Sequence, residues 1–216
     1  MKSFTRCARA VALAAIAFST APALANVTLF GDRATFSSIG TIAENYGFED
    51  INTTALGLVF PGDPWTAHGV TYTTGQNVII GSSAGLGEIS NVLTENSGKP
   101  LSGNIGGQYN LFGFELGNIF GNDTATVVLT TNLGSYTFSG LADSYIQTLP
   151  TMSFVGFSAA NGEYFTAFSI TPQSSYAAMD NVTLGFASVV PEPTSAALLL
   201  AGLGLFGFRT GRRRQA

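Results

Sequence analysis

A serine at the centre of Gly81-Ser82-Ser83-Ala84-Gly85 has the spacing of a hydrolase nucleophile, and an apolar segment, 77–80, precedes it. The G-x-S-x-G pattern places a serine on a sharp turn between a strand and a helix, and the enzyme then needs an acid and a histidine later in the chain. The only histidine, His68, comes before this serine, and no alternation of strands and helices surrounds the motif. We therefore interpret the motif as a turn and expect no hydrolase activity.

Carboxylates are the second group of residues that could perform chemistry, because glycoside hydrolysis uses two of them about 5 to 10 Å apart. A single histidine cannot build a zinc site without other histidines or cysteines, so we expect His68 at the surface or at a strand edge. Trp65 could stack on a sugar ring or lie in the core, and we expect it in the core. Nothing in the sequence selects one pair among the candidate acids Glu49, Asp50, Glu88, Glu95, Glu115, Asp143 and Glu163. We predict that the protein is not an enzyme.

Two acidic stretches resemble the ends of jelly-roll carbohydrate-binding modules. The first is YGFED, residues 46–50, and the second is YAAMDNVTLG, residues 176–185. Such modules often open with a Phe-Glu strand and close with an aspartate at the head of the last strand, where the two ends share a structural calcium ion. The resemblance implies Glu49 and Asp180 as ligands, with Asp50 as a further candidate. From the residues alone, Asp180-Asn181 fits equally well as a turn into the last strand.

Short strands are the elements that must position these residues. The segment between the chain ends is rich in glycine, phenylalanine, threonine and asparagine, which favours strands and tight turns. Residues 111–116 and 164–170 alternate with the period of two that is typical of antiparallel sheets. Turns are expected at Asn132-Leu133-Gly134 and at Asn161-Gly162. The expected strands are 27–30, 56–60, 69–73, 77–80, 111–116, 125–130, 135–138, 152–157, 164–170 and 181–186.

About ten short strands without crossover helices predict an all-β domain, an antiparallel β-sandwich of the jelly-roll type, over residues 26–188. Residues 82–110 are rich in Gly, Ser and Asn and are expected to form long loops with a short helix. The sandwich contains two basic and twelve acidic residues, a net charge of −10. This charge excludes nucleic acid as a partner, because phosphate binding needs clustered Lys and Arg. It suits attraction of divalent cations.

The N-terminus has the features of a secretory signal peptide, residues 1–25. Lys2, Arg6 and Arg9 precede a short apolar run, and the small residues Ala23 and Ala25 provide a cleavage site before Asn26. The run is too short for a membrane span of about 20 residues. The only cysteine, Cys7, lies in this leader, so the mature protein is expected to fold without a thiol or a disulfide.

The C-terminus carries a second signal. The triplet Pro191-Glu192-Pro193 is followed by an uncharged apolar segment, 194–208, and then by a basic cluster. As a helix this segment would be about 22 Å long, against about 30 Å of membrane core, which predicts a marginal transmembrane helix. The cluster would stay on the cytoplasmic side; it consists of Arg209, Arg212, Arg213 and Arg214.

Residues 189–216 therefore resemble the PEP-CTERM sorting signal. That family occurs in Gram-negative bacteria that make extracellular polysaccharide, as in biofilms, and an exosortase is thought to read the signal. The resemblance implies transient anchoring in the inner membrane, an exosortase as partner, and delivery to the cell surface or the extracellular space after C-terminal processing. A permanent C-terminal anchor is the alternative.

Three classes of function stay open for the central domain. The first is a non-catalytic surface or matrix protein that contacts extracellular polysaccharide. The second is a glycan-active enzyme on a similar sandwich. The third is an adhesin or ice-binding protein that uses exposed threonine rows such as Thr71, Thr73 and Thr74. The first is favoured because the chain lacks a histidine cluster and a convincing nucleophile.

Overall fold

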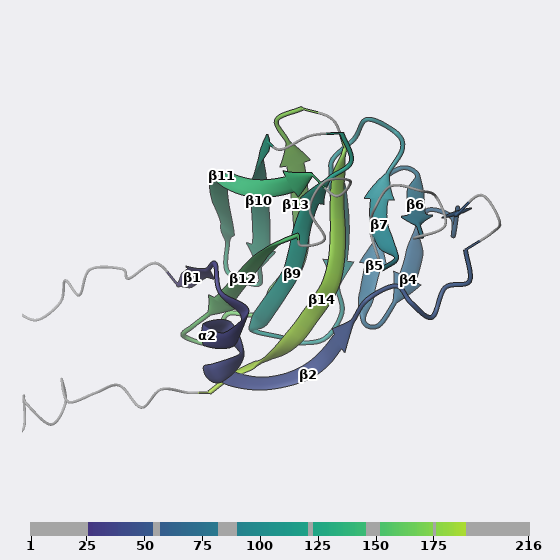
Figure 1. Ribbon diagram of the computed structural model, residues 1–216. Coiled ribbons are helices and arrows are strands. Elements are labelled where there is room, and N and C mark those ends of the chain that lie inside the picture. The colour runs from purple at the N-terminus through teal and green to yellow at the C-terminus, as the bar shows by residue number, and fades with distance from the viewer. Residues whose placement is uncertain are drawn as a thin grey trace, which may run out of the picture.

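The computed structural model describes residues 26–188, except 54–56, 82–89, 121–122, 146–151 and 175. These residues form two sheets packed face to face, a β-sandwich, with one short helix at one end (Figure 1). Pairing is antiparallel except at one point, where the end of β11 runs parallel to β9 and links the two sheets. The all-β prediction is confirmed, and the predicted leader and C-terminal helix lie outside the described residues.

The first sheet has β9 and β14 at its centre. β12 and β1 extend it on one side, and β2, β7, β6 and β3 extend it on the other. Its strands are β1 (Val27–Phe30), β2 (Gly40–Tyr46), β3 (Leu58–Val59), β6 (Asn77–Ile80), β7 (Val92–Glu95), β9 (Leu111–Asn118), β12 (Ser153–Ala159) and β14 (Ala177–Ala187).

The second sheet runs in the order β11-β10-β13-β8-β5-β4. Its strands are β4 (Trp65–Ala67), β5 (Val70–Tyr72), β8 (Leu101–Ile105), β10 (Asp123–Thr131), β11 (Ser135–Tyr145) and β13 (Phe165–Pro172). The hairpin between β10 and β11 confirms the turn expected at 132–134, and positive φ angles at Asn161 and Gly162 confirm the other expected turn.

The core fills the space between the sheets with aromatic and branched side chains. Phe112 of β9 contacts Phe168 of β13 across the sandwich, with ring centroids 5.1 Å apart. Trp65 is half-buried and stacks on the fully buried Tyr72 at 5.3 Å, so it belongs to the edge of this core, as expected. Burial of this apolar surface is the main stabilising contribution to the fold.

A change of neighbour along β14 creates the most irregular point of the first sheet. Residues 177–180 pair with β9, and residues 178 and 179 also pair with β7; residues 182–187 run between β9 and β2. The register with β9 shifts between Asp180 and Thr183, and Asn181 has a positive φ of 46°. β14 therefore carries a bulge where β7 and β2 separate, and bulges often re-aim side chains.

The helix α2 (Arg33–Ser38) covers the outer face of β9 and β12. Asp32 caps it, with its carboxylate accepting a hydrogen bond from the Thr35 backbone N at 2.7 Å. Phe36 is fully buried and lies over Gly113 and Gly156. Because of this cover, β9 is buried on both faces, whereas its alternating sequence suggested one face in water.

The expectation for residues 82–110 was wrong where the structure describes them. β7 and β8 lie in that segment, and both pair with neighbours on two sides. β2, β4 and α2 were also missed. β14 is longer than expected, because residues 177–180 pair with β7 and β9 before the bulge.

Candidate functional site

Asp180, a residue that the resemblance selected, lies at the bulge of β14 and is only 2% exposed. Its carboxylate accepts hydrogen bonds from Ser90 Oγ at 2.6 Å and from the Asn181 backbone N at 2.6 Å. Burial raises the pKa of Asp180 to about 6; the two hydrogen bonds oppose this shift, and the nearby charges of Glu115 and Glu49 add to it. An ionised Asp180 is therefore costly in this position.

Glu49, the other ligand that the resemblance implied, lies near Asp180. A β-carbon built on Gly47 would lie 3.1 Å from Asp180 Oδ1 and 3.7 Å from Glu49 Cγ, so both side chains flank this glycine. Glu49 Oε1 accepts a hydrogen bond from the Asn91 backbone N at 2.6 Å. The Phe-Glu pair itself follows β2 as a turn and does not form a strand.

Arg33 neutralises the other side of this polar region. Its guanidinium donates to Glu115 Oε1 at 3.2 Å, to Thr183 Oγ1 at 3.1 Å and to the Asn181 carbonyl at 3.2 Å. Glu115 Oε2 accepts a further bond from Asn181 Nδ2 at 2.9 Å. The polar set Glu49, Ser90, Glu115, Asp180 and Asn181 is called the bulge cluster below.

Asp50 is set apart from Asp180 by its environment. Its side chain is 67% exposed and lies 3.6 Å from His68 Nε2. Among residues 26–188 as far as they are described, no group of three or more His, Cys, Asp or Glu side chains is arranged to hold a metal ion. Calcium at Glu49 and Asp180 stays a prediction.

The other catalytic candidates have separate positions. Ser83 and Glu88 lie outside the described residues, as does the side chain of Asp143. Glu95 is 3% exposed and accepts bonds from the Ser97 and Lys99 backbone N atoms at 2.6 and 3.2 Å, so it holds its own loop. His68 is exposed, as expected, and stacks on Tyr46 at 4.3 Å.

An apolar groove lies on the outer face of β3, β6 and β7 and was not predicted. Its volume is about 240 Å³. Val78 and Ile80 of β6 form the floor, and Ile119 packs against them. Alternate β6 residues thus face the main core and the groove, which explains why all four side chains of this strand are buried.

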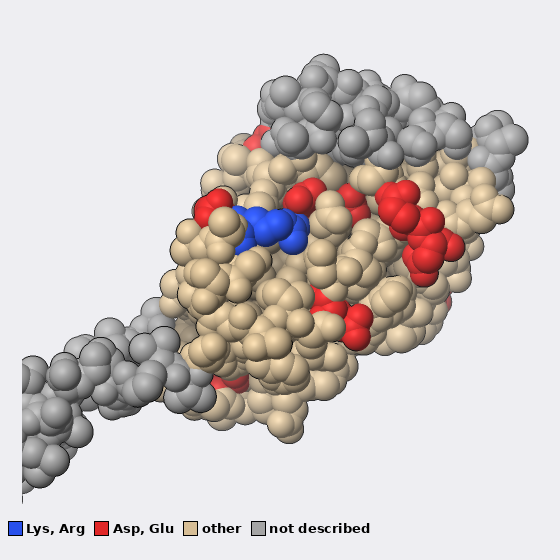
Figure 2. Space-filling view, turned by 60° about the horizontal axis from the view of Figure 1, so that its bottom comes forward, with Lys and Arg blue, Asp and Glu red and all other residues tan. Residues whose placement is uncertain are grey.

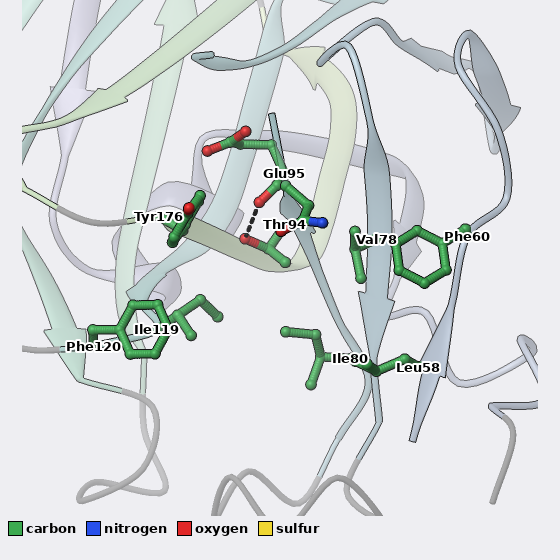
Figure 3. A pocket seen from close by; sticks show the side chains of 10 residues that line it. Leu58, Phe60, Val78, Ile80, Thr94, Glu95, Ile119, Phe120 and Tyr176 are labelled. Carbon is green, nitrogen blue, oxygen red and sulfur yellow. Dashed lines mark hydrogen bonds between the residues drawn. The ribbon is translucent and has the colours of Figure 1, made fainter. Parts of the chain in front are cut away.

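Three aromatic side chains surround this groove (Figure 3). Phe60 stands beside Val78 on one side, and Phe120 and Tyr176 face it from the other. Phe60 is 54% exposed and Phe120 is 65% exposed, although both are large and apolar. Phe120 and Tyr176 contact each other edge to face, with centroids 5.8 Å apart. Exposed aromatic rings around an apolar floor are typical of a binding site.

Acidic side chains gather on another surface of the domain. Figure 2 shows several of them on one face, together with a basic patch. Glu44 of β2 and Asp50 are among the exposed acids. This face would repel a polyanion and attract cations.

The outward face of the second sheet is uncharged along its central rows. Cross-strand pairing places small polar side chains side by side, and Thr66 and Thr71 hydroxyls are 2.9 Å apart. Thr73 is exposed and Thr71 is half-buried, but Thr74 is fully buried, so Thr74 does not belong to an exposed row. One row consists of Thr66, Thr71, Asn104, Ala167, Thr130 and Ser135.

The fold and these surfaces define the described part of the chain as an all-β sandwich domain. Residues 189–215 match the PEP-CTERM protein-sorting motif, which confirms the resemblance seen in the sequence. This motif marks an exported protein that an exosortase sorts to the cell surface or the extracellular space. The match covers the C-terminal segment alone.

No curated protein sequence matches the chain. A solved structure that is similar contains the CBM22-1 and GH10 modules of the Clostridium thermocellum endo-1,4-β-D-xylanase 10B in complex with xylohexaose. The sequence identity is 15% and the TM-score is 0.33, over 68% of this chain and 29% of that chain.

α2 is the only helix among the described residues, and no helix there has the length and hydropathy that crossing a membrane requires.

Proposed function

We propose that this protein is a non-catalytic surface or matrix protein whose sandwich binds extracellular polysaccharide in the apolar groove. The observation that carries the proposal is the exposure of Phe60 and Phe120 beside the apolar floor of Val78 and Ile80. Fully burying a phenylalanine side chain is worth about 1.5–3 kcal/mol, and the partly exposed Phe60 and Phe120 forgo a part of this. A ligand that covers these rings would recover part of that free energy.

A sugar ring suits the groove because one of its faces carries C–H groups and its rim carries hydroxyls. The C–H face would lie against Phe60, Phe120 and Tyr176. The hydroxyls would meet Asn96, whose exposed side chain lies at the edge of the groove. Apolar lining with a few polar groups is the usual composition of small-molecule sites.

The charge of the domain narrows the class of polysaccharide. With a net charge of −10 between residues 26 and 188, the domain repels polymers rich in uronic acid or sulfate, above all at low salt. We therefore propose a neutral or amino-sugar polymer as the ligand.

An enzymatic role is the weaker alternative. A raised pKa at Asp180 beside Glu115 and Glu49 is the kind of carboxylate pair that a glycosidase would need. However, Asp180 is only 2% exposed and already bonded to Ser90 and Asn181, and Glu115 is bonded to Arg33. These contacts fit a structural role better than contact with a substrate.

Adhesion to a solid surface such as ice is a second candidate function, because the outward face of the second sheet carries uncharged hydroxyl rows. This face is separate from the groove, so the two functions can be tested apart. Thermal hysteresis that disappears in a Thr71→Lys/Thr130→Lys variant would support the adhesive role and leave the groove unexplained.

The groove is tested with a Phe60→Ala/Phe120→Ala variant of the exported protein. Affinity electrophoresis and calorimetry would compare its binding to neutral, amino-sugar and uronate polysaccharides. We expect each phenylalanine to contribute about tenfold to affinity. Phe186→Ala is the matched control, because Phe186 is 49% exposed and packs on Tyr109, outside the groove. Equal binding by the double variant and the wild type would refute the groove as the glycan site.

A further inference from the structure

Glu163 is a buried carboxylate that neither the groove nor the bulge cluster uses. It is 2% exposed and lies between the 161–162 turn and β13. Thr131 Oγ1 donates to its Oε2 at 2.7 Å, and Tyr136 Oη donates to its Oε1 and Oε2 at 2.8 and 3.0 Å. Asn26 Nδ2 donates to Oε1.

These partners leave Glu163 ionised but without a cation. Burial raises its pKa, yet the hydrogen bonds from Thr131, Asn26 and Tyr136 outweigh burial and hold the pKa below its usual value. Within the described part of the chain, Glu163 makes no ion pair, and Arg33 is committed to Glu115. Buried charges in proteins are usually paired.

Asn26 is held firmly against this carboxylate. Its backbone carbonyl accepts a hydrogen bond from Ala160 N at 2.8 Å, and its side-chain Oδ1 accepts one from Asn161 Nδ2 at 3.0 Å. Residue 27 then begins β1, which pairs with β12 (Figure 1). The backbone nitrogen of Asn26 lies within about 5 Å of its own Nδ2, by covalent geometry alone. Because Nδ2 donates to Glu163 Oε1, this nitrogen lies within roughly 8 Å of that carboxylate oxygen.

We propose that Glu163 is the binding site for the α-ammonium group that signal-peptide cleavage creates at Asn26. The step adds water across the Ala25–Asn26 peptide bond: the carboxylate leaves on Ala25, and the ammonium stays on Asn26. A neutral amide is thereby replaced by a cation beside a buried anion. The proposal rests on the predicted cleavage site and is independent of the ligand of the groove.

The pairing makes the stability of the mature protein depend on pH. An α-ammonium group that pairs with Glu163 would have a pKa above the ordinary α-amine value of about 7.7–8.0, because the carboxylate favours the charged form. The contribution to stability is complete below that ordinary value and is lost as pH rises through the raised pKa. Tyr136 is the other titratable side chain that contacts Glu163, and its pKa is raised by the hydrogen bond to Glu163. Tyr136 therefore stays neutral in this range.

The experiment uses the exported protein as recovered from producing cells. Mass spectrometry first determines whether its N-terminal residue is Asn26. A second form has Gly-Ser inserted between Ala25 and Asn26, which moves the ammonium about 7 Å further along the chain. Both forms are made in the wild-type and Glu163→Gln backgrounds. The measurements are the α-amine pKa, from the pH dependence of its acylation rate, and the melting temperature from pH 6 to 10.

In the wild-type background we expect the insertion to lower the α-amine pKa and to lower the melting temperature at pH 7 by about 2–4 °C. In the Glu163→Gln background the insertion should change neither quantity. If Glu163→Gln does not fold, the difference in α-amine pKa between the two wild-type forms decides. An unshifted α-amine pKa, equal effects of the insertion in both backgrounds, or a mature terminus other than Asn26 would each overturn the proposal. None of these outcomes depends on polysaccharide binding.

Discussion

Asp180 combines deep burial with ionisation, and this makes it a source of pH-dependent stability. Its folded-state pKa of about 6 exceeds the ordinary value of 3.8, so the folded state binds a proton more tightly than the unfolded state. Stability is therefore lost as pH rises from about 4 to 6, by up to about 3 kcal/mol. Acids with lowered pKa values, such as Asp32 and Asp123, have the opposite slope.

Asp180→Asn should remove this loss. The amide oxygen can accept the bond from Asn181 N, and Ser90 Oγ can accept one from the amide nitrogen. We expect the variant to be at least as stable as the wild type at pH 7, with a flatter dependence between pH 4 and 6. Urea unfolding at several pH values measures both. The variant could instead be less stable than the wild type at pH 7, by more than the wild type loses between pH 4 and 6. That result would show that the ionised form of Asp180 is required.

The ionised form of Asp180 would be required if a cation bound beside it. Unfolding measurements with added calcium and with chelator test for such a cation. Two carboxylates near each other repel unless a cation lies between them, and Ca²⁺ takes oxygen ligands at about 2.3–2.6 Å. If Glu49 and Asp180 hold calcium, a hundredfold excess over the dissociation constant adds about 2.7 kcal/mol to stability. Asp180→Asn should then lose the calcium response, whereas Asp50→Asn should retain it. A wild type whose melting temperature ignores chelator would exclude the ion.

At the scale of single residues, the sequence identified Glu49 and Asp180 as neighbours only through the resemblance of two short strings. Ser90, Asn91 and Arg33 gave no such signal. Their roles arise because the bulge of β14 and the start of α2 bring distant segments together, and no local pattern encodes that meeting.

At the scale of elements, α2 rests on the first sheet only because two strand positions are glycine. A β-carbon on Gly156 would lie 2.6 Å from Phe36 Cδ2 and 2.9 Å from Phe154 Cε1, and one on Gly113 would lie 3.2 Å from the Phe36 ring. Real β-carbons essentially never approach other atoms as closely as 2.6 Å, so a methyl group at residue 156 must displace Phe36.

We therefore expect Gly156→Ala to destabilise the domain by about 1–3 kcal/mol, the usual cost of overpacking. Gly134→Ala is the control, since nothing lies within 4 Å of the added carbon and its φ is not in the positive range. Thermal unfolding followed by circular dichroism compares the two. Equal stability of both variants would mean that α2 does not pack as described.

The strands that were predicted share a feature that two of the missed strands, β8 and β2, lack. β6, β9 and β14 carry runs of branched or aromatic residues, whereas β8 reads LSGNI and β2 reads GTIAENY. Glycine and asparagine predict loops, but in β8 the glycine is required: a β-carbon on Gly103 would lie 2.9 Å from Phe168 Cε1. Packing across the sandwich makes these segments strands, although their local residue preferences favour loops.

At the scale of the molecule, the sandwich presents surfaces of different character. Acidic side chains lie on the face shown in Figure 2, the groove is lined mainly by aliphatic and aromatic residues with Thr94, Glu95 and Asn96 at one side, and the central rows of the second sheet are neutral. The alternation of apolar and polar residues along the strands allowed an all-β fold to be predicted. The groove could not be predicted, because Phe60, Phe120 and Tyr176 come from three separate segments that only the tertiary fold brings together.

The position of β14 in the sheet determines what C-terminal processing can remove. β14 ends at Ala187, and Ser188 N still donates to the Ile39 carbonyl at 2.8 Å, whereas the sorting motif begins at residue 189. Processing at the Pro191-Glu192-Pro193 triplet would therefore leave all pairing of β14 with β2, β7 and β9 intact. We expect the mature surface protein to lose the apolar segment and Arg212, Arg213 and Arg214, and to melt at the same temperature as the unprocessed chain.

Mass spectrometry of the protein from the cell surface determines its C-terminus. Glu192→Ala should leave the chain in the inner membrane, because the motif is no longer read, while its sandwich stays folded. Glu163→Ala is the contrasting variant, because it removes a buried, hydrogen-bonded carboxylate of the sandwich. It should reduce the amount of folded protein without changing where the C-terminus is cut. Surface protein that ends at Ala216 would make the segment a permanent anchor, and normal delivery of Glu192→Ala would show that this glutamate is not part of the recognised signal.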